Sequence, residues 1–312
     1  GYYTAVKKQG VYEYPYGTIR MNADGFPDTE FDLSSPKRRI GYFGDSMIFG
    51  VGAGDGYRFS DILEKRFPTY EHWTFSMLAN GIQDDDIIDQ AKKYGLNSII
   101  YAFNLNDILP LKKTLQDDRP QTNSKDETTF VRKIQSWVWR NMDGLRGQSY
   151  LYTWLRTLVK NALQKMGYSH TGFIAAELFP EDNQPLIRDT AQRVNNIARR
   201  LNDAGINFCV VVLPYEMQIS KDAQKTYTDL GILWQPGFEK GSTQRYLIDA
   251  FDFGAVYDGQ KAFSDVVETA KTGEFFVYNK GDKIDFNHPN RAGHKRLAEG
   301  FIKSHTCPAF PR

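Results

Sequence analysis

Apolar residues along the chain gather in short continuous runs, which are separated by longer stretches in which they recur at helical spacing. The run 98–103 is strongly apolar after Ser98, as expected for a strand that is covered on both faces of a parallel sheet. The stretch 59–67 instead carries apolar residues on one helical face. The pattern predicts strands at 40–43, 73–78, 98–103, 207–213 and near 255–257, and helices at 59–67, 84–94, 186–203, after Pro214 and at 290–303.

Strands that alternate with helices predict a parallel sheet with right-handed crossovers and helices on both faces. The alternation stops over 110–184, where two helical stretches (roughly 129–142 and 149–166) are rich in Trp and Tyr. We interpret 110–184 as a helical insertion whose aromatic residues form either a core or a substrate wall or lid. Residues 1–37 hold turn residues and no period, so they predict an irregular N-terminal wrap around one domain over 38–312.

Composition excludes some classes of function. The chain has 312 residues, with 39 Lys and Arg against 38 Asp and Glu, and no concentrated basic run. This balance argues against nucleic acid as a partner, because phosphate binding needs a positive face. No apolar stretch is long enough to span a membrane. Because the chain begins with Gly1 rather than Met, we expect a trimmed or processed form whose signal or anchor preceded residue 1.

Two cysteines leave the redox environment open. Cys209 lies within the apolar run 206–213 and is expected to be buried as a small hydrophobe. Cys307 stands in a tail beside Pro308. The sequence alone does not decide whether the two cysteines pair, or in which compartment the chain resides.

Candidate catalytic residues lie near the two ends of the chain. Ser46 follows an apolar strand on a Gly-Asp turn, where a parallel sheet exposes ligand-binding groups. A serine hydroxyl needs a base within hydrogen-bond reach. His288 is the best of five histidines, because Asp285 can orient its ring and stabilise the imidazolium. Taken singly, each fragment is more typical of a helix cap or a surface pair.

Two further residues strengthen the catalytic interpretation of Ser46 and His288. Asn106 follows the predicted strand 98–103 at its carboxyl end, and Gly81 follows the predicted strand 73–78. A glycine N–H and an asparagine amide are suitable donors for a developing oxyanion. Three successive strand ends therefore present Ser46, Gly81 and Asn106, and the base returns from the far end of the chain.

With these residues the chain resembles the SGNH, or GDSL-type, hydrolase family, over roughly 38–108 and 205–303. The four sequence blocks of the family correspond here to Gly44-Asp45-Ser46, Gly81, Asn106-Asp107 and Asp285-x-x-His288. The segment 288–294 also resembles the closing segment of the family. The resemblance implies an α/β fold, a flavodoxin-like three-layer α/β/α sandwich with a mostly parallel central sheet.

The resemblance also implies roles for the site residues. Ser46 is expected as the nucleophile, His288 as the base and Asp285 as the residue that orients it. The oxyanion hole would consist of the Ser46 and Gly81 N–H groups and the Asn106 side chain. Two positions depart from the family pattern: Asn104 stands where the third block usually begins with glycine, and Met47 stands where leucine is common.

The expected function is a serine esterase that acts on small acyl esters, chiefly O-acetyl groups, on a carbohydrate or polysaccharide, through an acyl-enzyme on Ser46. The alternative is a polysaccharide O-acetyltransferase with the same residues. A third reading is a non-catalytic glycan-binding module, which would not require the complete residue set. No cofactor and no metal are expected, and family habit favours a location outside the cytoplasm.

Other known motifs do not fit the spacing of residues in this chain. The glycines of 50–56 do not fit the Gly-x-Gly-x-x-Gly loop of dinucleotide sites. No Gly-x-Ser-x-Gly motif surrounds Ser46, which argues against the nucleophile elbow of α/β-hydrolases. The acidic run 84–86 is expected to begin a helix rather than to bind a metal.

The remaining histidines are expected in structural roles. His294 has no partners at the spacing of a metal site and is expected to cap or pack the last helix. His72, His170 and His305 lack acidic neighbours at useful spacing, so surface positions are expected for all three.

Overall fold

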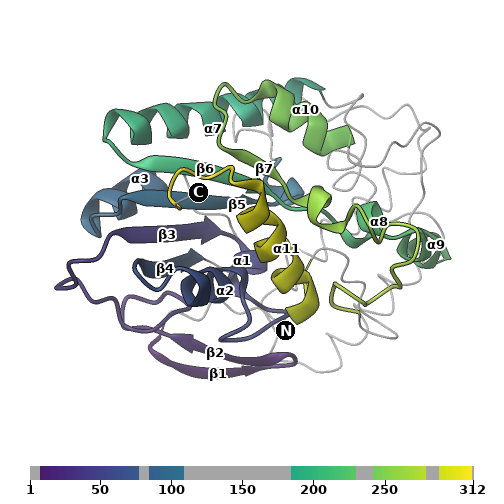
Figure 1. The fold of residues 1–312 in the computed structure, drawn as a ribbon, viewed down its shortest axis with the longest axis horizontal. Helices are drawn as coiled ribbons and strands as arrows, with labels where there is room; N and C mark the ends of the chain where they lie inside the picture. Colours follow the sequence, from purple (N-terminus) through teal and green to yellow (C-terminus); the bar gives the residue numbers. More distant parts are fainter. Residues whose placement is uncertain (1–7, 77–83, 109–183, 230–241, 279–287, 311–312) are drawn as a thin grey trace, which may run out of the picture.

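A five-stranded parallel sheet forms the centre of the computed structural model, which describes residues 8–76, 84–108, 184–229, 242–278 and 288–310 (Figure 1). The strands lie in the order β4-β3-β5-β6-β7. Each neighbouring pair is parallel. The strands are β3 (Arg39–Gly44), β4 (Glu71–Ser76), β5 (Ser98–Phe103), β6 (Asn207–Val212) and β7 (Val256–Asp258). This order is that of a flavodoxin-like sheet, so the predicted fold class is confirmed.

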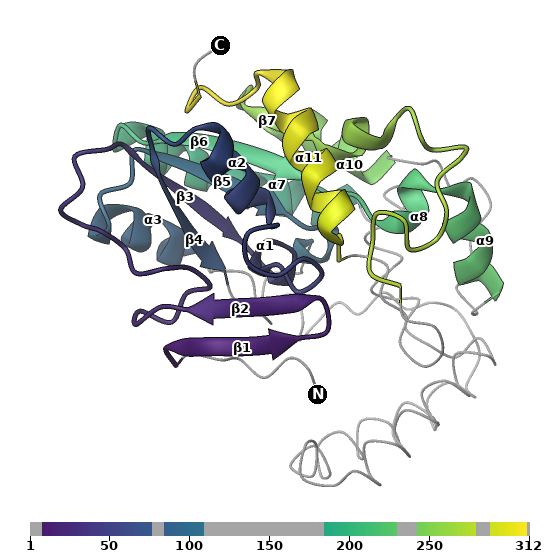
Figure 2. The ribbon, with the colours of Figure 1, turned by 60° about the horizontal axis from the view of Figure 1, so that its bottom comes forward.

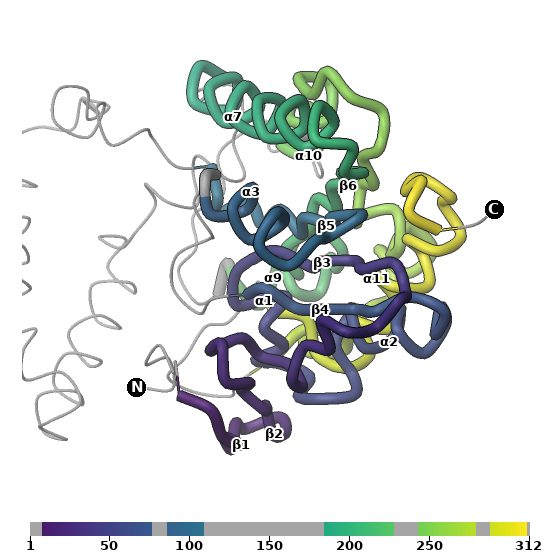
Figure 3. The backbone as a smooth tube through the Cα atoms, turned by 90° about the vertical axis from the view of Figure 1, so that its left-hand side faces the viewer, coloured from purple at the N-terminus to yellow at the C-terminus, as the bar shows by residue number. Residues whose placement is uncertain are grey.

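Helices cover both faces of the sheet, which gives three layers (Figure 3). On one face lie α2 (Phe59–Arg66) and α11 (Arg291–Ser304). On the other lie α3 (Asp84–Lys93) and α7 (Gln184–Asp203), with α10 (Ser242–Ala250) packed beside α7. The predicted positions of α2, α3, α7 and α11 are confirmed, because their apolar faces are long and regular.

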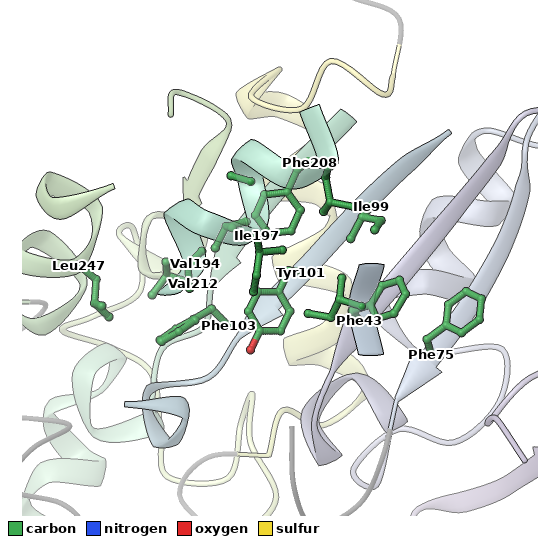
Figure 4. Packing of buried hydrophobic residues seen from close by; sticks show 14 of the residues in the cluster. Phe43, Phe75, Ile99, Tyr101, Phe103, Val194, Ile197, Phe208, Val212 and Leu247 are labelled. Atoms are coloured by element: carbon green, nitrogen blue, oxygen red, sulfur yellow. The ribbon is translucent and has the colours of Figure 1, made fainter. Parts of the chain in front are cut away.

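Strand β5 shows why the central strands lack a polar alternation. Ile99, Tyr101 and Phe103 pack toward α3 and α7, where Figure 4 shows them among other buried rings. Ile100 and Ala102 pack toward α2 and α11. Both faces of the strand are therefore removed from water, and every position favours an apolar residue.

A β-hairpin occupies part of the N-terminal segment that was expected to be irregular. Strands β1 (Gly10–Tyr14) and β2 (Gly17–Met21) pair antiparallel, below α1 (Ser46–Phe49) in the view of Figure 2. The Tyr14 and Phe49 rings pack in a T-shaped arrangement in this contact. The hairpin escaped prediction because its two-residue loop is Pro15-Tyr16, which lacks the Asn-Gly or Asp-Gly signal of tight hairpins.

Helix α10 was also missed, and its buried face explains why. Thr243 and Gln244 on that face are fully buried. The Gln244 amide pairs with the amide of Gln218 through two hydrogen bonds of 2.8 Å. Gln218 belongs to α8 (Glu216–Ile219), which with α9 (Lys221–Asp229) forms the predicted polar helical stretch after Pro214. Because polar side chains occupy two of the buried positions here, the apolar face, which includes the buried Leu247, is interrupted.

A buried arginine fixes the segment between the hairpin and the sheet. Arg58 donates hydrogen bonds to the Asp61 carboxylate and to the Pro27 carbonyl. Asp28, next in the chain, accepts a hydrogen bond of 2.7 Å from the Thr74 N–H of β4. Burial raises the pKa of Asp28 to about 7, although the Arg58 charge opposes the shift. The N-terminal segment is thus bound to the domain through polar groups as well as rings.

Two sequence predictions fall outside the described residues. The insertion over 110–184, with its two helical stretches, belongs to 109–183 except for its last residue. The predicted strand 73–78 extends past Ser76, where the described part of β4 ends. Among the described helices, none combines the length and the apolar character that a bilayer crossing requires.

A disulfide joins Cys209 to Cys307, which answers the question that the sequence left open. Cys209 lies in β6 and faces α11, and Cys307 lies in the tail that follows α11. Both residues are buried. The bond therefore ties the end of the chain across the face of the sheet that α11 covers.

Replacement of both cysteines by alanine should lower the free energy of unfolding by about 2–5 kcal/mol, because the bond closes a long loop in the unfolded chain. The two residues are separated by 98 positions. Urea unfolding of the oxidised protein and of the Cys209→Ala/Cys307→Ala variant measures the difference. Equal midpoints and slopes for the two proteins would contradict this expectation.

Candidate active site

Ser46 is the first residue of α1, directly after β3. The Asp45 side chain caps this short helix by accepting a hydrogen bond of 2.9 Å from the Met47 N–H. Gly50 ends the helix with φ +88°, and a Cβ at this position would lie 2.4 Å from Arg58 Cγ, so the turn favours glycine. Ser46 is therefore held at the carboxyl edge of the sheet, 9% exposed.

His288 reaches Ser46 from a position 242 residues further along the chain. Its Nε2 lies 2.8 Å from Ser46 Oγ, which is hydrogen-bonding distance. The backbone around His288 pairs with the segment 275–277: Val277 donates its N–H to the His288 carbonyl at 2.8 Å. A β-bridge between Phe276 and Pro289 continues this pairing. A serine and a nitrogen base are thus in contact, as nucleophilic catalysis requires.

Asn290 holds the histidine segment in place, a role that the sequence analysis missed. Its side-chain oxygen caps α11 by accepting hydrogen bonds from the Ala292 and Gly293 N–H groups. Its amide nitrogen lies within 3.2 Å of three carbonyl oxygens, those of Gly273, Glu274 and Phe276. An asparagine at the first position of the predicted helix 290–303 is the signal that could have indicated the cap, since the helix itself begins one residue later.

A buried carboxylate supports the same segment from the other side. Glu216, at the start of α8, accepts hydrogen bonds of 2.5 Å from the Gly273 N–H and from the Tyr227 hydroxyl. Gly273 has φ +84°, which suits glycine. The segment that pairs with His288 is therefore tied both to α8 and to the N-terminus of α11.

Close backbone packing joins the serine loop to the histidine loop. A Cβ on Gly52 would lie 2.2 Å from the Pro289 carbonyl oxygen and 2.6 Å from Val277 Cγ2. Arg291 adds a second link, since it donates hydrogen bonds to the Ala53 and Tyr16 carbonyls. The distance between Ser46 and His288 is therefore set by contacts between two loops as well as by the sheet.

Behind Ser46, the carboxylate of Asp45 binds two asparagine side chains. Its Oδ2 accepts hydrogen bonds from Asn104 Nδ2 at 2.8 Å and from Asn106 Nδ2 at 3.3 Å. Both asparagines follow β5, which lies beside β3 in the sheet. Asn104, which stands at the family's glycine position, is fully buried, so its side chain points into the protein.

Asp107 lies in the same buried region. It accepts hydrogen bonds of 3.2 Å from the Tyr101 hydroxyl and from the Asn104 N–H. Burial, and then the neighbouring Asp45 charge, raises the pKa of Asp107 to about 7. Two buried carboxyl groups therefore share the space beneath the carboxyl ends of β3 and β5.

The structure brings together three of the five residues predicted for the site. Ser46 contacts His288 directly, and Asn106 is linked to Ser46 through its neighbour Asp45. Gly81 and Asp285 lie outside the described residues, in 77–83 and 279–287. The other departure from the family pattern, Met47, is buried in the core beneath α2 and α11.

The remaining histidines show one wrong prediction. His72 is buried rather than on the surface, because its ring bridges the Tyr42 hydroxyl and the Phe67 carbonyl at 2.6 and 3.0 Å. His305 is exposed, as predicted, and ends α11 in a left-handed conformation. His170 lies outside the described residues.

His294 packs inside the last helix layer, as predicted, but it caps α2 rather than its own helix. Its Nδ1 accepts the Phe59 N–H at 3.2 Å, where α2 begins. Burial lowers the pKa of His294 to about 4. The acidic run at 84–86 lies at the start of α3, as predicted. Within the described part of the chain, no group of His, Cys, Asp or Glu side chains is arranged to hold a metal ion.

Gly52→Ala should slow the reaction of Ser46 with a fluorophosphonate by about 10²-fold, because the added Cβ would push the histidine loop away from the serine. The labelling rate constant of the purified protein measures the effect. Gly254→Ala is the matched control, since a Cβ there meets no atom within 4 Å. Equal labelling rates in the two variants would show that this contact does not set the geometry of the pair.

Stability should fall as the pH drops from 6.5 to about 4, through His294. In this interval the unfolded His294 binds a proton that the native ring does not, because its native pKa is lowered from 6.5 to about 4. In the His294→Asn variant, Oδ1 can accept the Phe59 N–H without titrating. The unfolding free energy of the native chain should therefore decline more steeply, by up to about 1.4 kcal/mol per pH unit. Parallel pH profiles for the two proteins would refute the assignment.

The chain has similarity to solved structures at low sequence identity. The chain is similar to the crystal structure of LAE5, an α/β hydrolase enzyme from the metagenome of Lake Arreo, Spain, at 13% identity and a TM-score of 0.40, over 86% of this chain and 94% of that one. It is also similar to a catalytic mutant of Axe2, an acetylxylan esterase from Geobacillus stearothermophilus, at 12% identity and a TM-score of 0.40, over 85% and 93%. These likenesses are too distant to bear on function. No curated protein matches the chain in a sequence comparison.

The match of the sequence to a known family is stronger evidence than these structural likenesses. The family described as GDSL-like Lipase/Acylhydrolase matches residues 40–301, which span β3 through most of α11 and include both Ser46 and His288. The chain therefore belongs to the GDSL-like lipase/acylhydrolase family, and it is an ester hydrolase of that family.

Proposed function

We propose that the protein is a serine esterase in which Ser46 forms an acyl-enzyme and His288 is the base. The contact of 2.8 Å between Ser46 Oγ and His288 Nε2 supports this proposal most directly. The two residues come from opposite ends of the family match, and several independent contacts hold them together. A serine that served only to cap α1 would not require a histidine on its hydroxyl.

The proposed reaction begins when His288 Nε2 removes the proton from Ser46 Oγ as the oxygen attacks the ester carbonyl. The carbonyl oxygen gains the negative charge, which the Ser46 N–H and the Asn106 amide stabilise. His288 then gives its proton to the leaving alcohol, and the acyl group stays on Ser46. A water molecule, deprotonated by His288, attacks the acyl-enzyme. The bond between the acyl group and Ser46 Oγ then breaks, His288 returns the proton to Ser46 Oγ, and the acid is released.

Two further roles are proposed from the family resemblance. The Gly81 N–H would complete the oxyanion hole, and the Asp285 carboxylate would orient His288 and stabilise its charged form. Their positions in the sequence support these roles, because Gly81 follows β4 and Asp285 stands three residues before His288.

The proposed substrate is a small acyl ester, an O-acetyl group, on a carbohydrate. The net charge of +1 supports a neutral ligand rather than a polyanion. Tyr278, 37% exposed, follows Val277 beside the histidine loop, where an aromatic face can pack on a sugar ring. Transfer of the acyl group to a polysaccharide uses the same residues, with a sugar hydroxyl in place of water.

We propose a location outside the cytoplasm. The disulfide between Cys209 and Cys307 supports it, because such bonds persist chiefly in oxidising compartments. Alkylation of cysteines in intact cells before lysis would test this location. Free thiols at both positions would argue for a cytoplasmic protein.

Ser46→Ala should abolish release of p-nitrophenol from p-nitrophenyl acetate, with a loss of at least about 10⁴-fold in kcat. It should also abolish labelling by a fluorophosphonate, while the thermal unfolding midpoint stays within a few degrees of the native value. The control is Ser304→Ala at the end of α11, which should keep full activity. Turnover retained by Ser46→Ala would overturn the assignment of the nucleophile.

The native protein also serves to test whether water or a sugar hydroxyl accepts the acyl group. Product analysis with an acetyl donor, in the presence and absence of an added glycan, separates hydrolysis from transfer. Acetate alone in both reactions supports the esterase, and an acetylated glycan supports the transferase. If the native protein shows no turnover and is not labelled by the fluorophosphonate, the non-catalytic binding module is favoured.

A further inference from the structure

Asn104 stands at the family's glycine position, and its side chain takes part in a contact that glycine cannot make. It is fully buried, and its Nδ2 donates a hydrogen bond of 2.8 Å to Asp45 Oδ2. Its backbone N–H donates to Asp107 Oδ2 at 3.2 Å. Asn104 therefore binds both buried carboxyl groups beneath the site, through its side chain and its backbone respectively.

Asp45 connects the nucleophile, Ser46, to the predicted oxyanion donor, Asn106. It immediately precedes Ser46, and its Oδ1 caps α1 through the Met47 N–H. Its Oδ2 accepts hydrogen bonds from Asn104 and, at the longer distance of 3.3 Å, from Asn106. A change in the position of this one carboxylate would thus act on both the serine turn and Asn106.

The carboxylate also determines which way the Asn106 amide faces. The Asp45 Oδ2 atom accepts from the NH₂ end of the amide, so the carbonyl end faces away from it. One amide hydrogen is directed to Asp45 Oδ2. Among the described residues, the second hydrogen has no acceptor. Asn106 is partly exposed, unlike Asn104.

We propose that Asn104 is a positioning residue for the oxyanion hole: it clamps the Asp45 carboxylate so that this carboxylate fixes the Asn106 amide with one N–H free for the oxyanion. The inference rests on the proposed function, in which Asn106 stabilises the oxyanion formed on attack by Ser46. Asn104 contacts no reacting atom and acts through Asp45. A neutral donor suits this position, because two buried carboxyl groups already lie there.

Asn104→Ala and Asn104→Gly should lower kcat for p-nitrophenyl acetate by about 10-fold, with KM changed less than twofold. The loss is smaller than the 10²–10³-fold cost of removing an oxyanion donor outright, because Asn106 remains. Affinity for phenylboronic acid, which forms a tetrahedral anionic adduct with serine, should fall by the same factor as kcat. Asn104→Ser, which keeps a smaller donor, should recover part of both losses.

The matched control is Asn22→Ala. Asn22 is also a buried asparagine whose side chain makes two hydrogen bonds, to the Phe26 N–H and the Thr29 carbonyl, but it lies in the N-terminal segment. Its replacement should lower the unfolding midpoint and leave kcat unchanged. Loss of kcat in proportion to loss of stability in both variants would overturn the proposal.

A double-mutant comparison tests whether Asn104 acts through Asn106. In an Asn106→Ala background, Asn104→Ala should lower kcat by less than twofold further, because the donor that it positions is already absent. An undiminished 10-fold effect would overturn the proposal. If the native protein lacks esterase activity, the proposed function fails first; if it is active and the Asn104 variants match it, only this inference fails.

Discussion

The hydrogen bond between Ser46 and His288 is the contact whose geometry depends most on the rest of the fold. Neither residue can hold the other, because both side chains are short and 242 residues separate them. The sheet fixes the serine, since β3 lies in the centre with neighbours on both sides. The histidine lies in a loop and depends on backbone pairing with 275–277 and on Asn290. The architecture therefore positions a loop residue against a residue fixed by the sheet.

Buried polar groups do much of this positioning. Asp45, Arg58, Glu216 and His294 are all buried and all hydrogen-bonded to groups from other elements. A buried charge is costly unless it is paired, so such groups tolerate few alternative arrangements. The apolar layers of Figure 4 hold the helices on the sheet. The polar contacts then fix the loops at the carboxyl edge, where apolar packing alone would leave their positions undetermined.

The sequence predicted the parts of the structure that follow from periodicity and from family pattern. Strand β5 was predicted with its observed bounds, because every position after Ser98 is apolar. The proximity of Ser46 and His288 came from the family pattern, since no local rule relates residues so far apart. The hairpin β1–β2 lacks a standard turn signal, and the apolar face of helix α10 is interrupted by buried polar residues, so local rules failed for both. The roles of Asn290 and Gly52 depend on contacts between loops, which one sequence does not reveal.

His72 is a further residue whose contacts the sequence alone did not reveal. A histidine without acidic neighbours in sequence was expected on the surface, but its partners are a tyrosine hydroxyl from the adjacent strand and a carbonyl at the end of α2. Asn104 is a parallel case. Its departure from the family pattern was visible in the sequence, but its partner, Asp45, became clear only from the adjacent strands.

The path of the chain also has a consequence for its biosynthesis. A ribosome releases the N-terminal part first, so Ser46 and strands β3 to β5 emerge long before α11. The base and its anchors, Asn290 and Arg291, are added near the end of the described chain, and Cys307 follows them. A nascent chain that stops short of His288 has the nucleophile without its partner. Hydrolytic capacity is thus withheld until nearly the whole fold has been synthesised.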